Sequence, residues 1–95
     1  MNNNPHIKIL ILNYNGEEII YKCLESVFNI DYDNYSVDVI DNGSTDNSIK
    51  IITESFHGAN LHKITKNLGY AKGYNYAFNQ LRDKKFEYYL ILNND

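Results

Sequence analysis

The sequence contains one cysteine, no excess of basic residues and no long hydrophobic run. Cys23 has no partner within the chain, which excludes an internal disulfide and favours a reducing, cytoplasmic setting. A net charge of −3 with no basic stripe argues against nucleic-acid binding. The longest apolar stretch, Ile7–Leu12, is interrupted by Lys8 and is far shorter than the roughly 18 residues of a membrane span. Residues Met1–His6 lack the basic and apolar regions of a signal peptide.

The hydrophobic residues of the chain predict alternating strands and helices within one domain of 95 residues. Runs of aliphatic and aromatic residues predict four strands, over Ile7–Leu12, Tyr35–Asp41, Leu61–Thr65 and Phe86–Leu92. Residues at helical spacing predict three helices between them, with apolar faces formed by Ile20, Cys23, Leu24, Val27 and Phe28, by Ile49, Ile52 and Phe56, and by Tyr70, Tyr74, Ala77, Phe78 and Leu81.

The ends of these helices are predicted from residues that suit helix termini. Glu17 and Glu18 are expected in the first turn of the first helix, where acids favour the helix dipole. Ser44 or Asp46 is expected to cap the second helix by accepting a backbone N–H. Gly58 is expected to end that helix in the left-handed conformation.

A strictly alternating order of strands and helices predicts an α/β fold. Units of this length predict a three-layer α/β/α arrangement, with a parallel four-stranded sheet, helices on both faces and right-handed crossovers. The strand order 3-2-1-4 places the ends of the first and fourth strands at a switch point, where diverging loops leave a crevice for a ligand.

Polar clusters follow all four predicted strands. Taken alone, each is an ordinary turn or helix cap. Because the carboxyl ends of parallel strands meet at one edge of a sheet, the clusters together predict a binding site there. An aromatic ring can stack on a base, an amide can pair with a base edge, and a carboxylate can bind a divalent cation. The clusters are Asn13–Asn15, Asp41–Gly43, Asn67–Gly69 and Asn93–Asp95.

In combination, these motifs resemble the amino-terminal half of family 2 glycosyltransferases, which have the GT-A fold. Four segments in the same order and spacing carry the resemblance and span almost the whole chain. The residues of the second and third segments are most similar to those of the rhamnosyltransferase-like branch. The segments are Ile9–Asn15, Val39–Asp46, Asn67–Asn75 and Leu90–Asp95.

The resemblance implies a site for a UDP- or dTDP-sugar donor. The backbone near Leu12 and the ring of Tyr14 would contact the uracil or thymine. Asn42 replaces an aspartate that often hydrogen-bonds the base, and its amide can still donate and accept. Asp41 would shape the same pocket. The whole implied donor site consists of Leu12, Asn13, Tyr14, Asp41, Asn42, Asn67, Gly69, Asn94 and Asp95.

The resemblance also implies a divalent metal, Mn²⁺ or Mg²⁺. Residues Asn93–Asp95 fall on the family's Asp-X-Asp motif but keep only its last acid, so Asp95 is the expected ligand. Tyr74 replaces an arginine that many members place near the diphosphate. The implied reaction is a direct, inverting displacement at the sugar's anomeric carbon, with a glycan or lipid-linked acceptor in cell-surface polysaccharide or glycan synthesis.

The chain is expected to be one truncated domain, residues 1–95, that holds the donor side of such an enzyme. No catalytic residue is assigned within it, because the general base is expected downstream. Alone, the chain is expected to be inactive. A cytoplasmic location is expected, with the inner face of the membrane as the alternative for a full-length protein. The predicted strand Phe86–Leu92 would be an apolar sheet edge, which favours a homo-oligomer.

Three other classes of protein have a similar order of elements. A receiver- or flavodoxin-like module would need acids after the first strand, where Asn13–Asn15 offers none. A dinucleotide-binding domain would need Gly-x-Gly-x-x-Gly there, and only Gly16 is present. A non-catalytic α/β interaction module derived from a donor domain remains the alternative. Neither the histidines, which lack metal-site spacing, nor Cys23, which lies on an apolar helix face, point to another chemistry.

Overall fold

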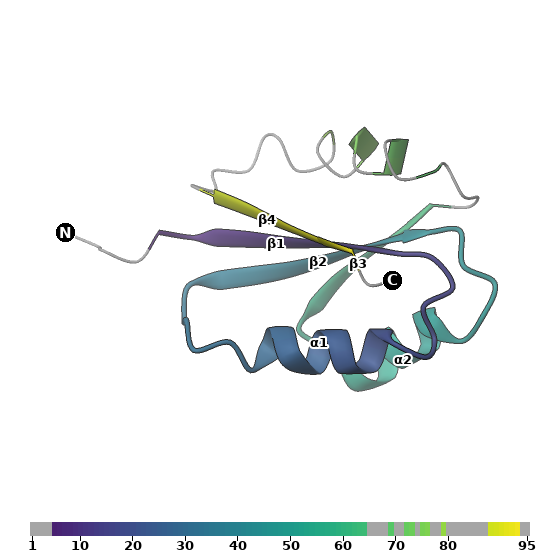
Figure 1. The fold of residues 1–95 in the computed structure, drawn as a ribbon, viewed down its shortest axis with the longest axis horizontal. Helices are drawn as coiled ribbons and strands as arrows, with labels where there is room; N and C mark the ends of the chain where they lie inside the picture. Colours follow the sequence, from purple (N-terminus) through teal and green to yellow (C-terminus); the bar gives the residue numbers. More distant parts are fainter. Residues whose placement is uncertain are drawn as a thin grey trace.

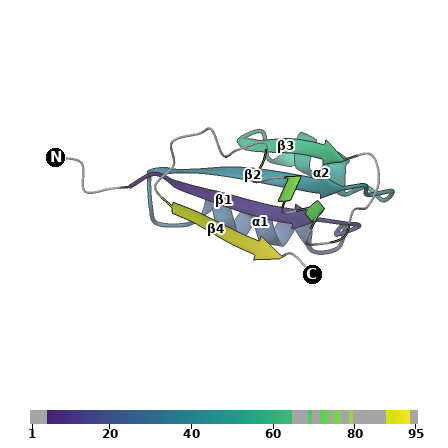
Figure 2. The ribbon, with the colours of Figure 1, turned by 90° about the horizontal axis from the view of Figure 1, so that it is seen from above.

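The computed structural model describes residues 5–64, 69, 72–73, 75–76, 79 and 88–93. Its four strands are all parallel and lie in the order β3-β2-β1-β4 (Figure 2). This order is the predicted one, and it confirms the α/β sheet. Along the chain the elements are β1 (Ile7–Asn13), α1 (Ile20–Phe28), β2 (Tyr35–Asn42), α2 (Ser48–Ser55), β3 (Ala59–Ile64) and β4 (Tyr88–Asn93).

The main hydrophobic core lies between one face of the sheet and the two helices. Figure 1 shows α1 and α2 together beneath this face. Alternate residues of β1 and β2 point toward the helices because successive side chains of a strand point to opposite faces. The buried core residues are Ile9 and Ile11 of β1, Val37 and Val39 of β2, Ile20, Leu24 and Val27 of α1, and Ile52 of α2.

A smaller apolar cluster lies on the opposite face, near the carboxyl ends of the strands. Leu12 and Ile40 are buried there, with Ile64 and Tyr76 packed against them. The described residues between 69 and 79 are helical and lie above this face in Figure 1, which confirms helices on both faces. The residues that predict the third helix, Tyr70, Tyr74, Ala77, Phe78 and Leu81, lie outside the described residues.

A buried ion pair lies on that opposite face and joins β1 to β2. Lys8 Nζ donates to Asp38 Oδ1 at 2.7 Å, and the two side chains are 5% and 2% exposed. Asn60 Nδ2 lies 3.1 Å from the same oxygen, and His62 Nε2 lies 2.8 Å from Asp38 Oδ2. Burial by itself would raise the pKa of Asp38, but the hydrogen bonds from Lys8, Asn60 and His62 more than offset it and lower that pKa.

The helix termini differ from the sequence-based expectation at two points. The first helix begins at Ile20, so Glu17 and Glu18 precede it and are not in its first turn. The reason is a turn over residues 17–19, closed by bonds from the Ile19 and Ile20 amides to the Gly16 carbonyl at 2.9 and 2.7 Å.

Gly58 does not have the left-handed conformation expected of a helix cap. Helix α2 is followed by Phe56 as its C-cap, and only Gly43 and Gly69 among the described glycines have positive φ. Gly58 instead lies against a ring, since a Cβ there would be 3.3 Å from Phe28 Cε1. Cys23 is half-buried against the core as expected, and burial raises the pKa of its thiol.

Candidate functional site

The carboxyl ends of the four strands lie at one edge of the sheet. In register, Asn13 pairs with Asp41, Asn42 with Ile64, and Leu12 with Asn93 of β4. The β1–α1 loop (residues 14–19) and the β2–α2 loop (residues 43–47) leave from this edge. The topology therefore brings the polar clusters after β1 and β2 together, as the sequence predicts.

Two buried residues join the ends of β1 and β2. Asn13 is fully buried, and its Nδ2 donates to Asp41 Oδ1 at 2.8 Å and to Ser48 Oγ at 3.0 Å. Asp41 is 1% exposed and also accepts bonds from Ser44, at 2.7 Å from Oγ and 2.9 Å from the amide. Both oxygens of Asp41 are thus bonded to the protein, so Asp41 shapes this edge by holding the β2–α2 loop.

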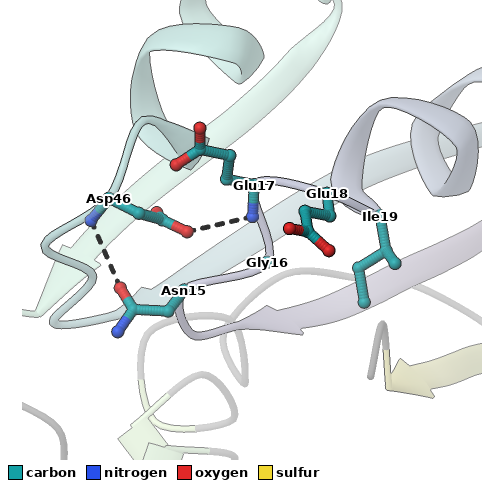
Figure 3. Close-up of a pocket in the computed structure, with 6 residues that line it drawn as sticks. All are labelled: Asn15, Gly16, Glu17, Glu18, Ile19 and Asp46. Atoms are coloured by element: carbon teal, nitrogen blue, oxygen red, sulfur yellow. Dashed lines mark hydrogen bonds between the residues drawn. The ribbon is translucent and has the colours of Figure 1, made fainter.

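The two loops also exchange hydrogen bonds with each other. Asp46 Oδ2 accepts the Glu17 amide at 3.0 Å, while Glu17 Oε1 accepts the Asn47 amide at 3.1 Å. Asn15 Oδ1 accepts the Thr45 amide at 2.8 Å and the Asp46 amide at 3.3 Å. Figure 3 shows Asn15 and Glu17 facing Asp46 across the space between the loops. These bonds make the two loops one structural unit.

Helix α2 has Asn47 as its N-cap, without a side-chain capping bond, and its first amide is bonded to Asp46 instead. Asp46 Oδ1 accepts the Ser48 amide at 2.9 Å and the Ser48 hydroxyl at 2.5 Å. Burial alone would raise the pKa of Asp46, but the bonds from Ser48 and the Glu17 amide lower it. Of the two alternatives, Ser44 is engaged elsewhere, because its hydroxyl donates to Asp41 and accepts the Asn15 amide at 2.8 Å.

An open depression of about 370 Å³ lies beside these loops (Figure 3). Its lining is polar and carries three carboxylates. The carboxylates of Glu17 and Asp46 already accept hydrogen bonds between the two loops. We therefore interpret the depression as the outer surface of the joined loops. It is lined by Asn15, Gly16, Glu17, Glu18, Ile19 and Asp46.

Asn42 lies on the other face, beneath the helical residues that follow β3. Its side chain is 2% exposed, and its Nδ2 donates to the Gly69 carbonyl at 3.2 Å. Gly73 lies equally close, since a Cβ there would be 2.9 Å from Leu12 Cδ1 and 3.3 Å from Asn42 Nδ2. A glycine at 73 is therefore what allows this segment to approach the ends of β1 and β2.

The structure brings most of the described candidate residues together. Leu12, Asn13, Asp41 and Asn42 are buried at the strand ends, whereas the Tyr14 side chain is 46% exposed. Gly69 joins them through its bond to Asn42. The other candidates, Asn67, Asn94 and Asp95, lie outside the described residues.

Within the described residues, no group of three or more histidine, cysteine, aspartate or glutamate side chains could hold a metal ion. Asn93 ends β4 and pairs with Leu12, so β4 also ends at this edge of the sheet. Among the helices of the described part, none is long and apolar enough to cross a membrane.

The residues that join the loops lie outside the donor site that the resemblance implies. They form hydrogen bonds between β1 or its loop and the chain after β2, and Asn15 alone among them belongs to a predicted polar cluster; they are Asn15, Glu17, Ser44 and Ser48. One signal was present for Asn15, because asparagine before glycine tolerates the left-handed conformation, and its φ is 49°. No local signal links Glu17 to Asn47, which lies 30 residues away.

Comparison with solved structures defines the class of fold. One similar structure is a mannosyltransferase from Pyrobaculum calidifontis, solved with GDP-Man and Mn²⁺. The match covers 99% of this chain and 28% of the mannosyltransferase chain, with a TM-score of 0.82 and 26% sequence identity. Another is TarS from S. aureus, solved as residues 1–349 with UDP-GlcNAc. The match covers 95% of this chain and 26% of the TarS chain, with a TM-score of 0.82 and 24% sequence identity. The chain therefore has the GT-A fold of glycosyltransferases.

The sequence itself places the chain in a family. The family described as glycosyl transferase family 2 matches residues 8–95, so the chain belongs to that family. A similar relative is the dolichyl N-acetyl-alpha-D-glucosaminyl phosphate 3-beta-D-2,3-diacetamido-2,3-dideoxy-beta-D-glucuronosyltransferase of Methanococcus voltae, 33% identical over 88 residues. That match covers 90% of this chain and 27% of the relative, so the chain spans about a quarter of the relative's length.

Proposed function

We propose that this chain binds the nucleotide-sugar donor of a family 2 glycosyltransferase, as a UDP- or dTDP-sugar with a divalent metal. The observation that carries the proposal is the exposed ring of Tyr14 at the edge where Asn13, Asp41 and Asn42 converge. The relatives support it, because one is solved with GDP-Man and Mn²⁺ and another with UDP-GlcNAc.

In this proposal, the residues at each strand end either contact the donor or support those that do. The Tyr14 ring stacks on the base, the backbone near Leu12 and the amide of Asn42 contact it, and Asp41 with Asn13 keeps the edge in shape. Asn67, Gly69 and Asn94 complete the donor site. Asn42 donates to the Gly69 carbonyl, so a contact of its amide with the base would depend on the position of Gly69.

We assign the metal to Asp95, the acid retained from the family's Asp-X-Asp motif. Mn²⁺ or Mg²⁺ would supply charge neutralisation for the departing nucleoside diphosphate. A direct displacement at the anomeric carbon would invert its configuration. We place the general base and the binding of a glycan or lipid-linked acceptor in the part of the relatives that this chain does not span, and we expect no complete transfer by the 95-residue chain alone.

Two finer assignments rest on the sequence. The residues of Val39–Asp46 and Asn67–Asn75 support a place in the rhamnosyltransferase-like branch of the family. The unpaired Cys23 supports a cytoplasmic setting, with polysaccharide or glycan synthesis at the inner face of the membrane.

The test is calorimetric titration of UDP, dTDP and GDP into the chain, with and without Mn²⁺. Asp95→Ala removes the proposed ligand, and Asp31→Ala removes an exposed acid before β2, away from this edge, as the control. We expect Mn²⁺-dependent binding of UDP or dTDP that Asp95→Ala abolishes and Asp31→Ala preserves. Binding unchanged by Asp95→Ala would refute the metal assignment. No binding of any nucleotide would favour the non-catalytic interaction module instead.

A further inference from the structure

Tyr14 lies between two asparagines whose side chains both bind the chain that follows β2. On one side, the Asn13 amide reaches Asp41, Ser44 and Ser48 at 2.8, 3.3 and 3.0 Å. On the other side, Asn15 Oδ1 accepts the amides of residues 45 and 46 at 2.8 and 3.3 Å. The backbone is therefore anchored immediately before and immediately after Tyr14, whose own side chain is 46% exposed.

Asn13 and Asn15 are held in place by different parts of the structure. Asn13 is fully buried and belongs to β1, so its place is set by the sheet. Asn15 is exposed, lies in the loop and has a φ of 49°, a conformation that glycine and asparagine tolerate better than other residues. The backbone N–H of Asn15 also donates to Ser44 Oγ at 2.8 Å. Asn15 thus fixes the path of the β1–α1 loop by its backbone and by its side chain together.

We propose that Asn15 is a positioning residue that holds the Tyr14 ring in place for a nucleobase. This inference rests on the proposed function, because it assumes that Tyr14 contacts the base. Asn15 does not touch the donor in this scheme and acts through the β2–α2 loop. Glu17 also bonds to Asp46 and to Asn47, which joins the same two loops a second time, and Figure 3 shows its bond to Asp46.

The energetic reason is preorganisation. A loop that is already fixed loses little conformational freedom when a ligand binds. If the loop adopts the binding-competent path for only a fraction of the time, the apparent affinity falls by that fraction. Loss of the Asn15 side-chain bonds should therefore weaken nucleotide binding even though no contact with the nucleotide is removed.

Two substitutions separate the backbone and side-chain contributions of Asn15. Asn15→Gly permits the positive φ and removes the acceptor oxygen, whereas Asn15→Asp keeps an oxygen that can accept the amides of Thr45 and Asp46. Ile52→Val, in the core under the sheet, serves as a control that lowers stability away from the loops. All three are compared with the wild-type chain by calorimetric titration of UDP and dTDP, and by hydrogen exchange of the Thr45 and Asp46 amides.

We expect Asn15→Gly to bind nucleotide about tenfold more weakly, as for a loop that is competent about a tenth of the time, and to exchange both amides faster. The Kd of Asn15→Asp for nucleotide should be within about threefold of the wild-type Kd. Ile52→Val should leave the affinity unchanged. Wild-type affinity in Asn15→Gly, or an equal loss in Ile52→Val, would overturn the positioning role. Failure of the wild-type chain to bind any nucleotide would overturn the proposed function and, with it, the donor role of Asn15. In that case amide exchange would still report whether the loops are joined.

Discussion

Lys8 Nζ lies 2.7 Å from Asp38 Oδ1 on one face of the sheet, with both side chains almost fully buried. Breaking such an ion pair from one side is strongly destabilising, because the remaining charge stays buried and loses its charged partner. The pair lies on β1 and β2, toward the amino ends from the candidate site. Its role is therefore expected to be in stability, and it can be tested separately from ligand binding.

Asp38→Asn should lower the free energy of unfolding by about 3 kcal/mol at neutral pH, since it leaves the Lys8 ammonium buried beside a neutral amide. Urea unfolding followed by circular dichroism measures the change. Asp31→Asn makes the same chemical change at an exposed position and should have an effect below about 0.5 kcal/mol. A loss below about 1 kcal/mol in Asp38→Asn would contradict the expected cost of breaking the buried pair from one side.

The same pair predicts a pH dependence. The pKa of Asp38 in the folded chain lies below its ordinary value of 3.8, so the carboxylate stabilises the fold above that value. This contribution is lost as the pH falls through the lowered pKa. The difference in stability between wild type and Asp38→Asn should therefore be constant above about pH 5 and shrink in more acidic solution. Urea titrations at several pH values measure it, and a difference that grows on acidification would refute the assignment.

Asn42 places a buried amide at the end of β2. Its Nδ2 donates to the Gly69 carbonyl, so Asn42→Asp would place a carboxylate oxygen against a carbonyl oxygen at a buried position. We expect a loss of about 1–3 kcal/mol at pH 7 and a smaller loss near pH 4, where a protonated carboxyl can donate the same bond. Thermal unfolding at both pH values measures this, with Asn75→Asp at an exposed position as the control. Equal losses at the two pH values would count against the bond.

The edge strand predicts self-association. Leu90 and Ile91 of β4 are 44% and 43% exposed, and as consecutive strand residues they lie on opposite faces. An apolar edge without charge or proline favours pairing with another strand. We expect the chain to form oligomers at high concentration and Leu90→Lys to shift it toward monomer, as measured by light scattering. Ile30→Lys, at another exposed apolar position, is the control. A wild-type chain that stays monomeric would contradict this prediction.

Much of the fold follows from local patterns in the sequence. The aliphatic runs predict the strands to within a few residues, and parallel topology then requires that Asn13, Asp41 and Asn42 meet at one edge. Helix boundaries were less predictable. Glu17 has the right composition for a first turn, but the Gly16 carbonyl closes a separate turn, and the helix begins at Ile20.

The order of elements, the face that each strand residue occupies and the edge at which polar residues gather follow from the sequence, because they depend on periodicity and connection alone. The tertiary structure sets which polar group bonds to which. It engages both oxygens of Asp41, joins Asn15 to the Thr45 amide, and pairs Glu17 with Asn47. The physical reason is that these partners are brought together by packing, and the partners of Asn15 and Glu17 lie 30 residues away along the chain, beyond the reach of any local pattern.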